Sequence, residues 1–162
     1  MDQLSQWLEN IGIESLNAMQ QEAVDVVNTT ADVVLLAPTG SGKTLAFLLP
    51  LAARLDGAAN GVQALLIVPT RELALQIEQV WKALKTGFKV TCCYGGHDFA
   101  TEARSLSEAP ALIIGTPGRI LDHIHRRTVD LSTVTSLVLD EYDKSLELGY
   151  QEEMEGLVNA LT

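Results

Sequence analysis

The sequence lacks a long apolar run and an export signal at its start. No stretch of its 162 residues reaches the roughly 18 consecutive apolar residues that a membrane-spanning helix needs. Residues 1–4, Met-Asp-Gln-Leu, do not form the basic and then apolar segment of a secretory signal. We therefore expect a cytoplasmic protein.

Cysteine is nearly absent. The two cysteines, Cys92 and Cys93, are adjacent in the chain. Adjacent cysteines rarely bond to each other, and two thiols alone do not complete a structural zinc site. We predict two free thiols that alternate across a strand, in a protein of a reducing compartment.

Basic residues are also scarce. The chain has 11 Lys and Arg against 21 Asp and Glu, a net charge of −10, which argues against a broad nucleic-acid-binding surface but allows a local basic edge. With 47% hydrophobic residues the chain can bury a full core. Its length, without repeats or a Pro/Gly-rich linker, predicts a single domain over residues 1–162.

Short apolar runs alternate with longer segments of helical period. The apolar runs lie at residues 33–36, 64–68, 90–94, 111–114 and 137–139. Helical segments lie between them at residues 44–55, 72–84, 99–106 and 119–124, with others at 4–9, 18–28 and 151–161. Strands and helices in alternation predict an α/β fold, with a parallel sheet that carries helices on both faces.

A glycine-rich segment follows the first apolar run and precedes a helix. It has Ala37 where the general phosphate-loop pattern begins with glycine, and it ends in Lys43 and Thr44. Its glycines let backbone N–H groups turn toward phosphate oxygens at the positive end of the helix. We predict a P-loop in which Lys43 reaches the β- and γ-phosphates and Thr44 binds Mg²⁺. The nucleotide-binding residues would be Ala37, Thr39, Gly40, Ser41, Gly42, Lys43 and Thr44.

Two acidic residues end the fifth apolar run. A carboxylate at the tip of a strand suits a Mg²⁺ ligand that acts partly through water, which we assign to Asp140. Glu141 is placed to orient the attacking water. With Lys43, these two form the predicted catalytic set. The alternatives are a solvated acidic strand end and a phosphate loop that is inactive.

Three further loops follow the second, third and fourth runs. Thr70 and Thr116 are at helix N-cap positions, and Pro117 suits the first helical position. The helix N-termini would offer N–H groups to phosphates, with charge from Arg71 and Arg119. The simpler alternative is that these are well-capped helix starts. The loop residues are Pro69, Thr70, Arg71, Gly95, Gly96, Thr116, Pro117, Gly118 and Arg119.

Taken in order, the phosphate loop, the three loops and the segment from Asp140 to Asp143 resemble motifs I, Ia, the glycine doublet, Ib and II of DEAD-box RNA helicases. The resemblance runs from about Gly12 to the end of the chain. It implies the first RecA-like P-loop motor domain of such an enzyme, with ATP and Mg²⁺ as cofactors. It also implies that the three loops bind the backbone of single-stranded RNA.

Residues 12–20 resemble the adenine-reading Q motif of the same family. Gln20 would hydrogen-bond the adenine edge, and Ile13 would lie against the base. The family usually has Pro-Thr where this chain has Leu16-Asn17. We assign residues 1–30 to the Q-motif helices and 31–162 to the P-loop core.

The chain departs from the family in two respects. Tyr142 replaces the alanine of motif II, and we expect its ring to pack beneath that motif without touching a ligand. No Ser-Ala-Thr motif and no second RecA-like domain follow, so we expect a domain truncated before its end that binds nucleotide but hydrolyses it very slowly. Two alternatives are a P-loop helicase of another group acting on DNA and a non-catalytic ATP- and RNA-binding module.

Overall fold

The computed structural model describes residues 1–162 and divides them into two compact units. One unit consists of Met1–Leu55 and Trp81–Thr86, and the other of Asp56–Val80 and Gly87–Thr162. None of the helices is both long and apolar enough to span a bilayer. Each unit is described by itself below.

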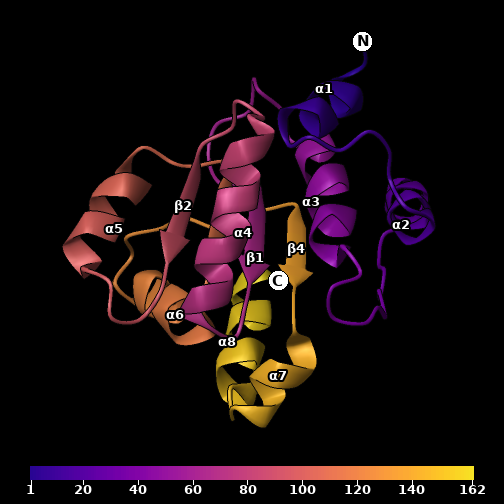
Figure 1. The fold of residues 1–162 in the computed structure, drawn as a ribbon. Helices are drawn as coiled ribbons and strands as arrows, with labels where there is room; N and C mark the ends of the chain where they lie inside the picture. The colour runs from indigo at the N-terminus through magenta and orange to yellow at the C-terminus, as the bar shows by residue number, and fades with distance from the viewer. The chain divides into compact units, whose positions relative to one another are not determined.

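The second unit contains a parallel four-stranded sheet. Its strands are β1 (Ala64–Ile67), β2 (Val90–Cys93), β3 (Leu112–Gly115) and β4 (Ser136–Leu139), in the order β2-β3-β1-β4 (Figure 1). Ala64 pairs with Leu112 of β3 on one side and Ser136 of β4 on the other. Four of the five predicted strands are therefore confirmed, each to within one residue.

Helices cover both faces of this sheet, as the continuously apolar strands predicted. One face packs against α4 (Arg71–Leu84), which contributes the buried side chains Ala74 and Ile77. The other packs against α5 (Phe99–Ser107), α6 (Pro117–His125) and α8 (Gln151–Leu161). Leu106, Ile120 and Leu157 from these three helices join Leu65 and Ile67 of β1 in one hydrophobic core. The short helix α7 (Tyr142–Glu147) follows β4.

The first unit contains three helices with well-defined starts. They are α1 (Gln3–Asn10), α2 (Ala18–Thr29) and α3 (Lys43–Arg54), and α2 packs against α3. Asp2 caps α1 by accepting a hydrogen bond from the backbone N–H of Ser5 at 2.7 Å. Asn17 and Gln20 form a reciprocal capping box at the start of α2. All three helices match the predicted segments closely.

The predicted strand at residues 33–36 is wrong, because this segment forms neither helix nor strand. A continuously apolar strand is stabilised when both of its faces are covered. Here Val34 is 85% exposed and Leu36 is 90% exposed, so burial of these side chains would contribute little to the stability of a strand. The phosphate loop therefore follows an irregular segment instead of the strand that we expected.

Candidate functional site

The phosphate loop ends in an open helix N-terminus. Gly40 and Gly42 have φ values of +79° and +85°, in the left-handed region that favours glycine. Gly42 is the N-cap of α3, and no side chain caps the helix there. The N–H groups of the first turn of α3 therefore keep the anion-binding character of an uncapped helix start.

Ser41 adds an unsatisfied polar atom to this loop. Its hydroxyl oxygen is buried and has no hydrogen-bond partner within the protein. Buried polar atoms are nearly always paired, so one left unpaired in a glycine-rich loop fits a polar ligand there. The loop residues thus fit the phosphates of a nucleotide.

Gln20 and Asn17 brace the phosphate loop. Gln20 Nε2 donates to the carbonyl oxygen of Gly42 at 3.0 Å, and Asn17 Nδ2 donates to that of Ser41 at 3.1 Å. A Cβ atom on Gly42 would lie 2.5 Å from Gln20 Nε2 and would displace this amide, and the φ of +85° itself favours glycine. The bracing role of Asn17 was missed from the sequence, although Asn followed by Gln three residues later is the spacing of a capping box.

The Gln20 amide is already partly engaged. Besides donating to Gly42, it accepts a hydrogen bond from the backbone N–H of Asn17 at 3.0 Å, and the residue is only 6% exposed. A primary amide has two protons and two lone pairs, so one of each remains for a further partner. Ile13, the other predicted adenine contact, is partly buried after α1.

Motif II lies at the carboxyl end of β4. The backbone N–H of Asp140 donates to the carbonyl oxygen of Ile67 at 3.0 Å, and Asp140 Oδ1 accepts from the backbone N–H of Glu141 at 3.0 Å. Glu141 has a φ of +53°, a conformation that strains a residue other than glycine and that is frequent at functional sites. Asp140 and Glu141 belong to the second unit, whereas Lys43 and Thr44 belong to the first.

The prediction for the Tyr142 ring was wrong. Tyr142 begins α7 and is 46% exposed, so its ring does not pack beneath motif II. A phenol ring at the surface leaves its hydroxyl to water, so the hydroxyl needs no partner within the protein.

The other three loops gather at one edge of the sheet. Because β1, β2 and β3 are parallel neighbours, the segments that follow them leave the sheet together at its carboxyl edge. The backbone N–H of Val68 donates to Gly115 O and that of Thr116 donates to Cys93 O, both at 3.0 Å. These bonds continue the ladder into the loops.

The two threonines begin their helices differently. Thr70 Oγ1 accepts a hydrogen bond from the backbone N–H of Leu73 at 3.2 Å, which confirms the predicted cap. Thr116 is the N-cap of α6 and Pro117 lies in its first turn, as predicted, but the Thr116 side chain makes no capping bond. The first turn of α6, which includes Gly118, is therefore not closed by a side chain.

The glycine doublet forms a tight turn beside the first loop. The backbone N–H of His97 donates to Tyr94 O at 3.3 Å, and Gly96 has a φ of +85°, the value that the third residue of a type II turn requires. The Arg71 guanidinium carbon lies 5.6 Å from the centre of the Tyr94 ring. A Cβ atom on Gly96 would lie 3.6 Å from Arg71 Nη1, so the Arg71 side chain lies beside this turn.

Arg119 is turned toward the same glycine turn. Its Nε donates to Tyr94 O at 3.1 Å, and its Nη2 donates to His97 O. Its Nε also lies 3.1 Å from Glu102 Oε1, and its side chain is 14% exposed. Arg119 therefore contacts protein carbonyl and carboxylate oxygens on both sides of the doublet.

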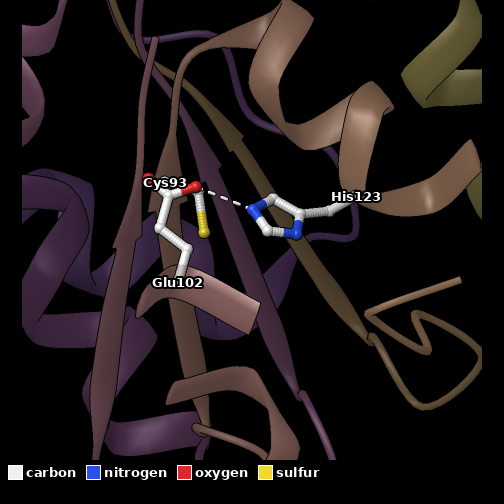
Figure 2. Close-up of side chains that lie close together, drawn as sticks. All are labelled: Cys93, Glu102 and His123. Carbon is white, nitrogen blue, oxygen red and sulfur yellow. Dashed lines mark hydrogen bonds and ion pairs between the residues drawn. The ribbon is translucent and has the colours of Figure 1, made fainter. Parts of the chain in front are cut away.

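A buried polar cluster lies behind these loops and was missed from the sequence. Cys93 of β2, Glu102 of α5 and His123 of α6 converge, with one ligand-type atom of each within 4.8 Å of the others (Figure 2). The Glu102 side chain is fully buried and pairs with His123 Nε2 at 2.7 Å. The only signal in the sequence was an acidic residue and a histidine on the faces of their helices where apolar residues are expected.

The cluster has zinc-type residues but the electrostatics of an ion-pair network. Burial, helped by the negative charge of Glu102, raises the pKa of the Cys93 thiol to about 12, so the thiol stays protonated. Burial also raises the pKa of Glu102, but hydrogen bonds from His123, the Tyr94 N–H and His97, with the charge of Arg119, bring it below its ordinary value. A carboxylate with these four partners is already satisfied, which does not favour metal ligation.

A surface hollow of about 430 Å³ lies apart from all these loops. Its lining includes Gln63 just before β1, Lys89 just before β2 and Ala111 just before β3. It is therefore at the amino-terminal edge of the parallel sheet. None of the predicted site residues lines it.

Comparison with known proteins identifies the family. The family model described as DEAD/DEAH box helicase matches residues 17–162. The chain is 41% identical over 153 residues to the ATP-dependent RNA helicase CshA of Listeria monocytogenes, covering 93% of this chain and 29% of that protein. It is 40% identical over 154 residues to the ATP-dependent RNA helicase DeaD of Escherichia coli, covering 93% of this chain and 24% of that protein. The chain thus spans less than a third of the length of these relatives.

Solved structures of the family share the fold. A DEAD box protein from Methanococcus jannaschii matches with a TM-score of 0.92 and 35% identity, over 100% of this chain and 45% of that one. The yeast DEAD-box splicing factor Prp28 matches with a TM-score of 0.87 and 28% identity, over 98% of this chain and 39% of that one. These likenesses confirm the RecA-like fold. Because the family match takes in the phosphate loop, the three sheet-edge loops and motif II, the chain belongs to the DEAD/DEAH box helicase family.

Proposed function

We propose that this chain is the ATP-binding motor domain of an ATP-dependent RNA helicase, which uses ATP and Mg²⁺ to remodel RNA. The observation that carries the proposal is the phosphate loop, where an uncapped helix start, a buried Ser41 hydroxyl without a partner and the Gln20 brace occur together. The relatives' names, ATP-dependent RNA helicase, agree with it.

The proposed nucleotide contacts follow from the loop. Backbone N–H groups from Gly40 to Thr44 bind the phosphates, and Lys43 adds a charge-assisted contact. The free proton and lone pair of Gln20 read the adenine edge, with Ile13 against the base. Mg²⁺, when bound, neutralises phosphate charge, and Thr44 and Asp140 offer the hard oxygen ligands that it prefers.

The proposed hydrolytic residue is Glu141. Its carboxylate would orient the attacking water, as a general base does at the end of a strand. The strained backbone at Glu141 supports this role, because such conformations persist where the surrounding structure holds a side chain in one direction.

The proposed RNA contacts lie at the carboxyl edge of the sheet. Pro69, Thr70 and Arg71 form one side, the Gly95–Gly96 turn the middle, and Thr116, Pro117, Gly118 and Arg119 the other side. Open N–H groups at a helix start bind phosphate without reading sequence. The small number of basic side chains here fits a strand held mainly by backbone groups.

Nucleotide binding is tested by replacing the phosphate-loop lysine. Lys43→Ala removes a contact worth about 1.5–3 kcal/mol, so ADP affinity should fall by roughly 10- to 150-fold. Lys82→Ala, at an exposed position in the last turn of α4, is the matched control and should bind like the wild type. A titration with a fluorescent ADP measures both. Unchanged affinity in a folded Lys43→Ala variant would refute the proposal.

RNA and DNA binding are compared with labelled single strands of the same sequence. Phosphate contacts alone do not distinguish the two, whereas contacts to 2′-hydroxyl groups do. Tighter binding of the oligoribonucleotide supports the RNA helicase. Equal or tighter binding of the oligodeoxynucleotide would favour a helicase that acts on DNA.

A further inference from the structure

Glu102 is a buried acidic residue to which the proposed function gives no part. It lies on α5 and its side chain has no exposed area. Its Oε2 accepts from the backbone N–H of Tyr94 at 3.0 Å and from His97 Nδ1 at 2.8 Å. Its Oε1 accepts from His123 Nε2 at 2.7 Å and lies 3.1 Å from Arg119 Nε. Oε2 thus has two hydrogen-bond donors, and Oε1 has one donor and one ion-pair partner.

The four partners of Glu102 come from the two segments that carry the glycine doublet and the third loop. Tyr94 and His97 are the first and last residues of the turn that contains Gly95 and Gly96. Arg119 and His123 lie on α6, whose first turn follows Thr116. One carboxylate therefore joins the turn to the helix start.

Arg119 completes the link from the other side. Its guanidinium donates to Tyr94 O and to His97 O, while it pairs with Glu102. Tyr94 and His97, the two ends of the turn, therefore each make two hydrogen bonds. Each donates an N–H to the Glu102 carboxylate, and each accepts a hydrogen bond from the Arg119 guanidinium at its carbonyl oxygen. A turn held in this way has few alternative conformations, so its backbone groups are fixed before a ligand arrives.

We propose that Glu102 is a positioning residue for RNA: its buried carboxylate, with Arg119, fixes the Gly95–Gly96 turn relative to the start of α6, so that both present their backbone groups to one RNA strand. The inference rests on the proposed function. It assigns Arg119 mainly to the protein, and it leaves Arg71 as the basic side chain that faces the strand.

The test compares variants at residue 102 for RNA and ADP affinity in the 162-residue protein. Glu102→Ala should weaken binding of a fluorescein-labelled oligouridylate at least about tenfold at low salt, because two loops lose their common anchor. ADP affinity should stay within about twofold of the wild type, since the four partners of the carboxylate all lie between residues 94 and 123. Glu102→Gln keeps an acceptor but loses the charge, so its RNA affinity should lie between those of wild type and Glu102→Ala.

Leu106→Ala controls for a general loss of stability. Leu106 lies one turn further along α5 and is buried in the core, and its apolar side chain offers no hydrogen bond to either loop. Its truncation should lower the thermal midpoint and leave the RNA affinity within about twofold of the wild type. If Leu106→Ala weakens RNA binding as much as Glu102→Ala, the carboxylate acts only through stability and the inference is wrong.

The remaining outcomes are also decisive. If Glu102→Ala does not fold, Glu102→Gln carries the test, and RNA affinity equal to that of the wild type overturns the inference. In a cycle with Arg119→Ala, the double variant should bind RNA about as weakly as the weaker single variant, because the two residues act as one clamp. If the fold losses in RNA affinity of the two single variants multiply in the double variant, the two residues act independently and the clamp is contradicted. Failure of the wild type to bind RNA would refute the proposed function itself.

Discussion

Gln20 braces the phosphate loop and is proposed to read adenine, and Gln20→Ala tests both. Its amide bonds Asn17 N and Gly42 O, both at 3.0 Å, and the residue is 6% exposed. Gln20→Ala removes both hydrogen bonds and leaves a partly buried N–H and carbonyl unpaired. At about 0.5–1.5 kcal/mol per hydrogen bond, the free energy of unfolding should fall by about 1–3 kcal/mol. Urea unfolding measures this loss.

The same variant should lose base selectivity. A brace for the phosphate loop affects the phosphates, which ADP and GDP share, whereas a contact to the adenine edge affects only ADP. Guanine presents an acceptor where adenine presents its amino group, so we expect the wild type to prefer ADP by about tenfold or more. Gln20→Ala should weaken both nucleotides and also reduce this ratio. Competition against a fluorescent nucleotide gives the two affinities.

Gln21→Ala is the matched control for this measurement. Gln21 is the next residue of α2 and is exposed, and its side chain donates to Asp25 Oδ1 at 3.1 Å on the helix surface. It should keep both the stability and the selectivity of the wild type. If Gln20→Ala weakens ADP and GDP by one common factor, Gln20 braces the loop without reading the base. Equal binding of ADP and GDP by the wild type would refute the adenine assignment altogether.

Three further predictions concern the second unit and the whole chain. Tyr142→Ala should leave the free energy of unfolding within about 0.5 kcal/mol of the wild type and leave Mg²⁺-dependent ADP binding unchanged, because the ring is largely at the surface; loss of binding in the folded variant would contradict this. The folded pKa of Glu102 is below its ordinary value of 4.5, so its contribution to stability is complete above that pH and is lost as the pH falls through the folded value. Urea unfolding at several acidic pH values should show that the free energy of unfolding of the wild type falls with pH and that this fall is smaller in Glu102→Gln. An equal fall in both proteins would contradict the assigned role of the Glu102 charge. The 162-residue chain should hydrolyse ATP very slowly with or without RNA, because an arginine finger contributes about 10³–10⁵ in rate and no arginine here is assigned to that role; rapid RNA-stimulated phosphate release that disappears in Glu141→Gln would show the reasoning to be wrong.

The sheet was predictable where burial and pattern agree. The runs that became β1 and β3 are continuously apolar and fully buried, so periodicity and tertiary structure point to the same element. Residues 33–36 have a similar composition but expose Val34 and Leu36, which no local pattern reveals. Whether an apolar run becomes a strand depends on what pairs with it and covers it, and a sequence window contains neither.

The site was predictable where a motif has local geometry. Gly40 and Gly42 have the positive φ values that the loop pattern requires. Glu102 was not predictable in the same way, because its four partners come from residues 94 to 123 and meet only after β2, α5 and α6 have packed. No fixed spacing in the sequence identifies the residues of such a buried ion pair.

The neighbouring cysteines give the sheet two intrinsic probes of its own opening. Cys92 Sγ donates to Ala74 O at 3.6 Å beneath α4, whereas Cys93 faces Glu102 and His123 on the other side of β2. Burial and the charge of Glu102 raise the pKa of Cys93 to about 12, so the thiol stays protonated while the unit stays closed. Since alkylating reagents attack the thiolate, labelling of Cys93 should proceed almost entirely through molecules in which α5 and α6 have separated from the sheet. Alkylation rates in Cys92→Ser and Cys93→Ser would then report how often each face of the sheet opens.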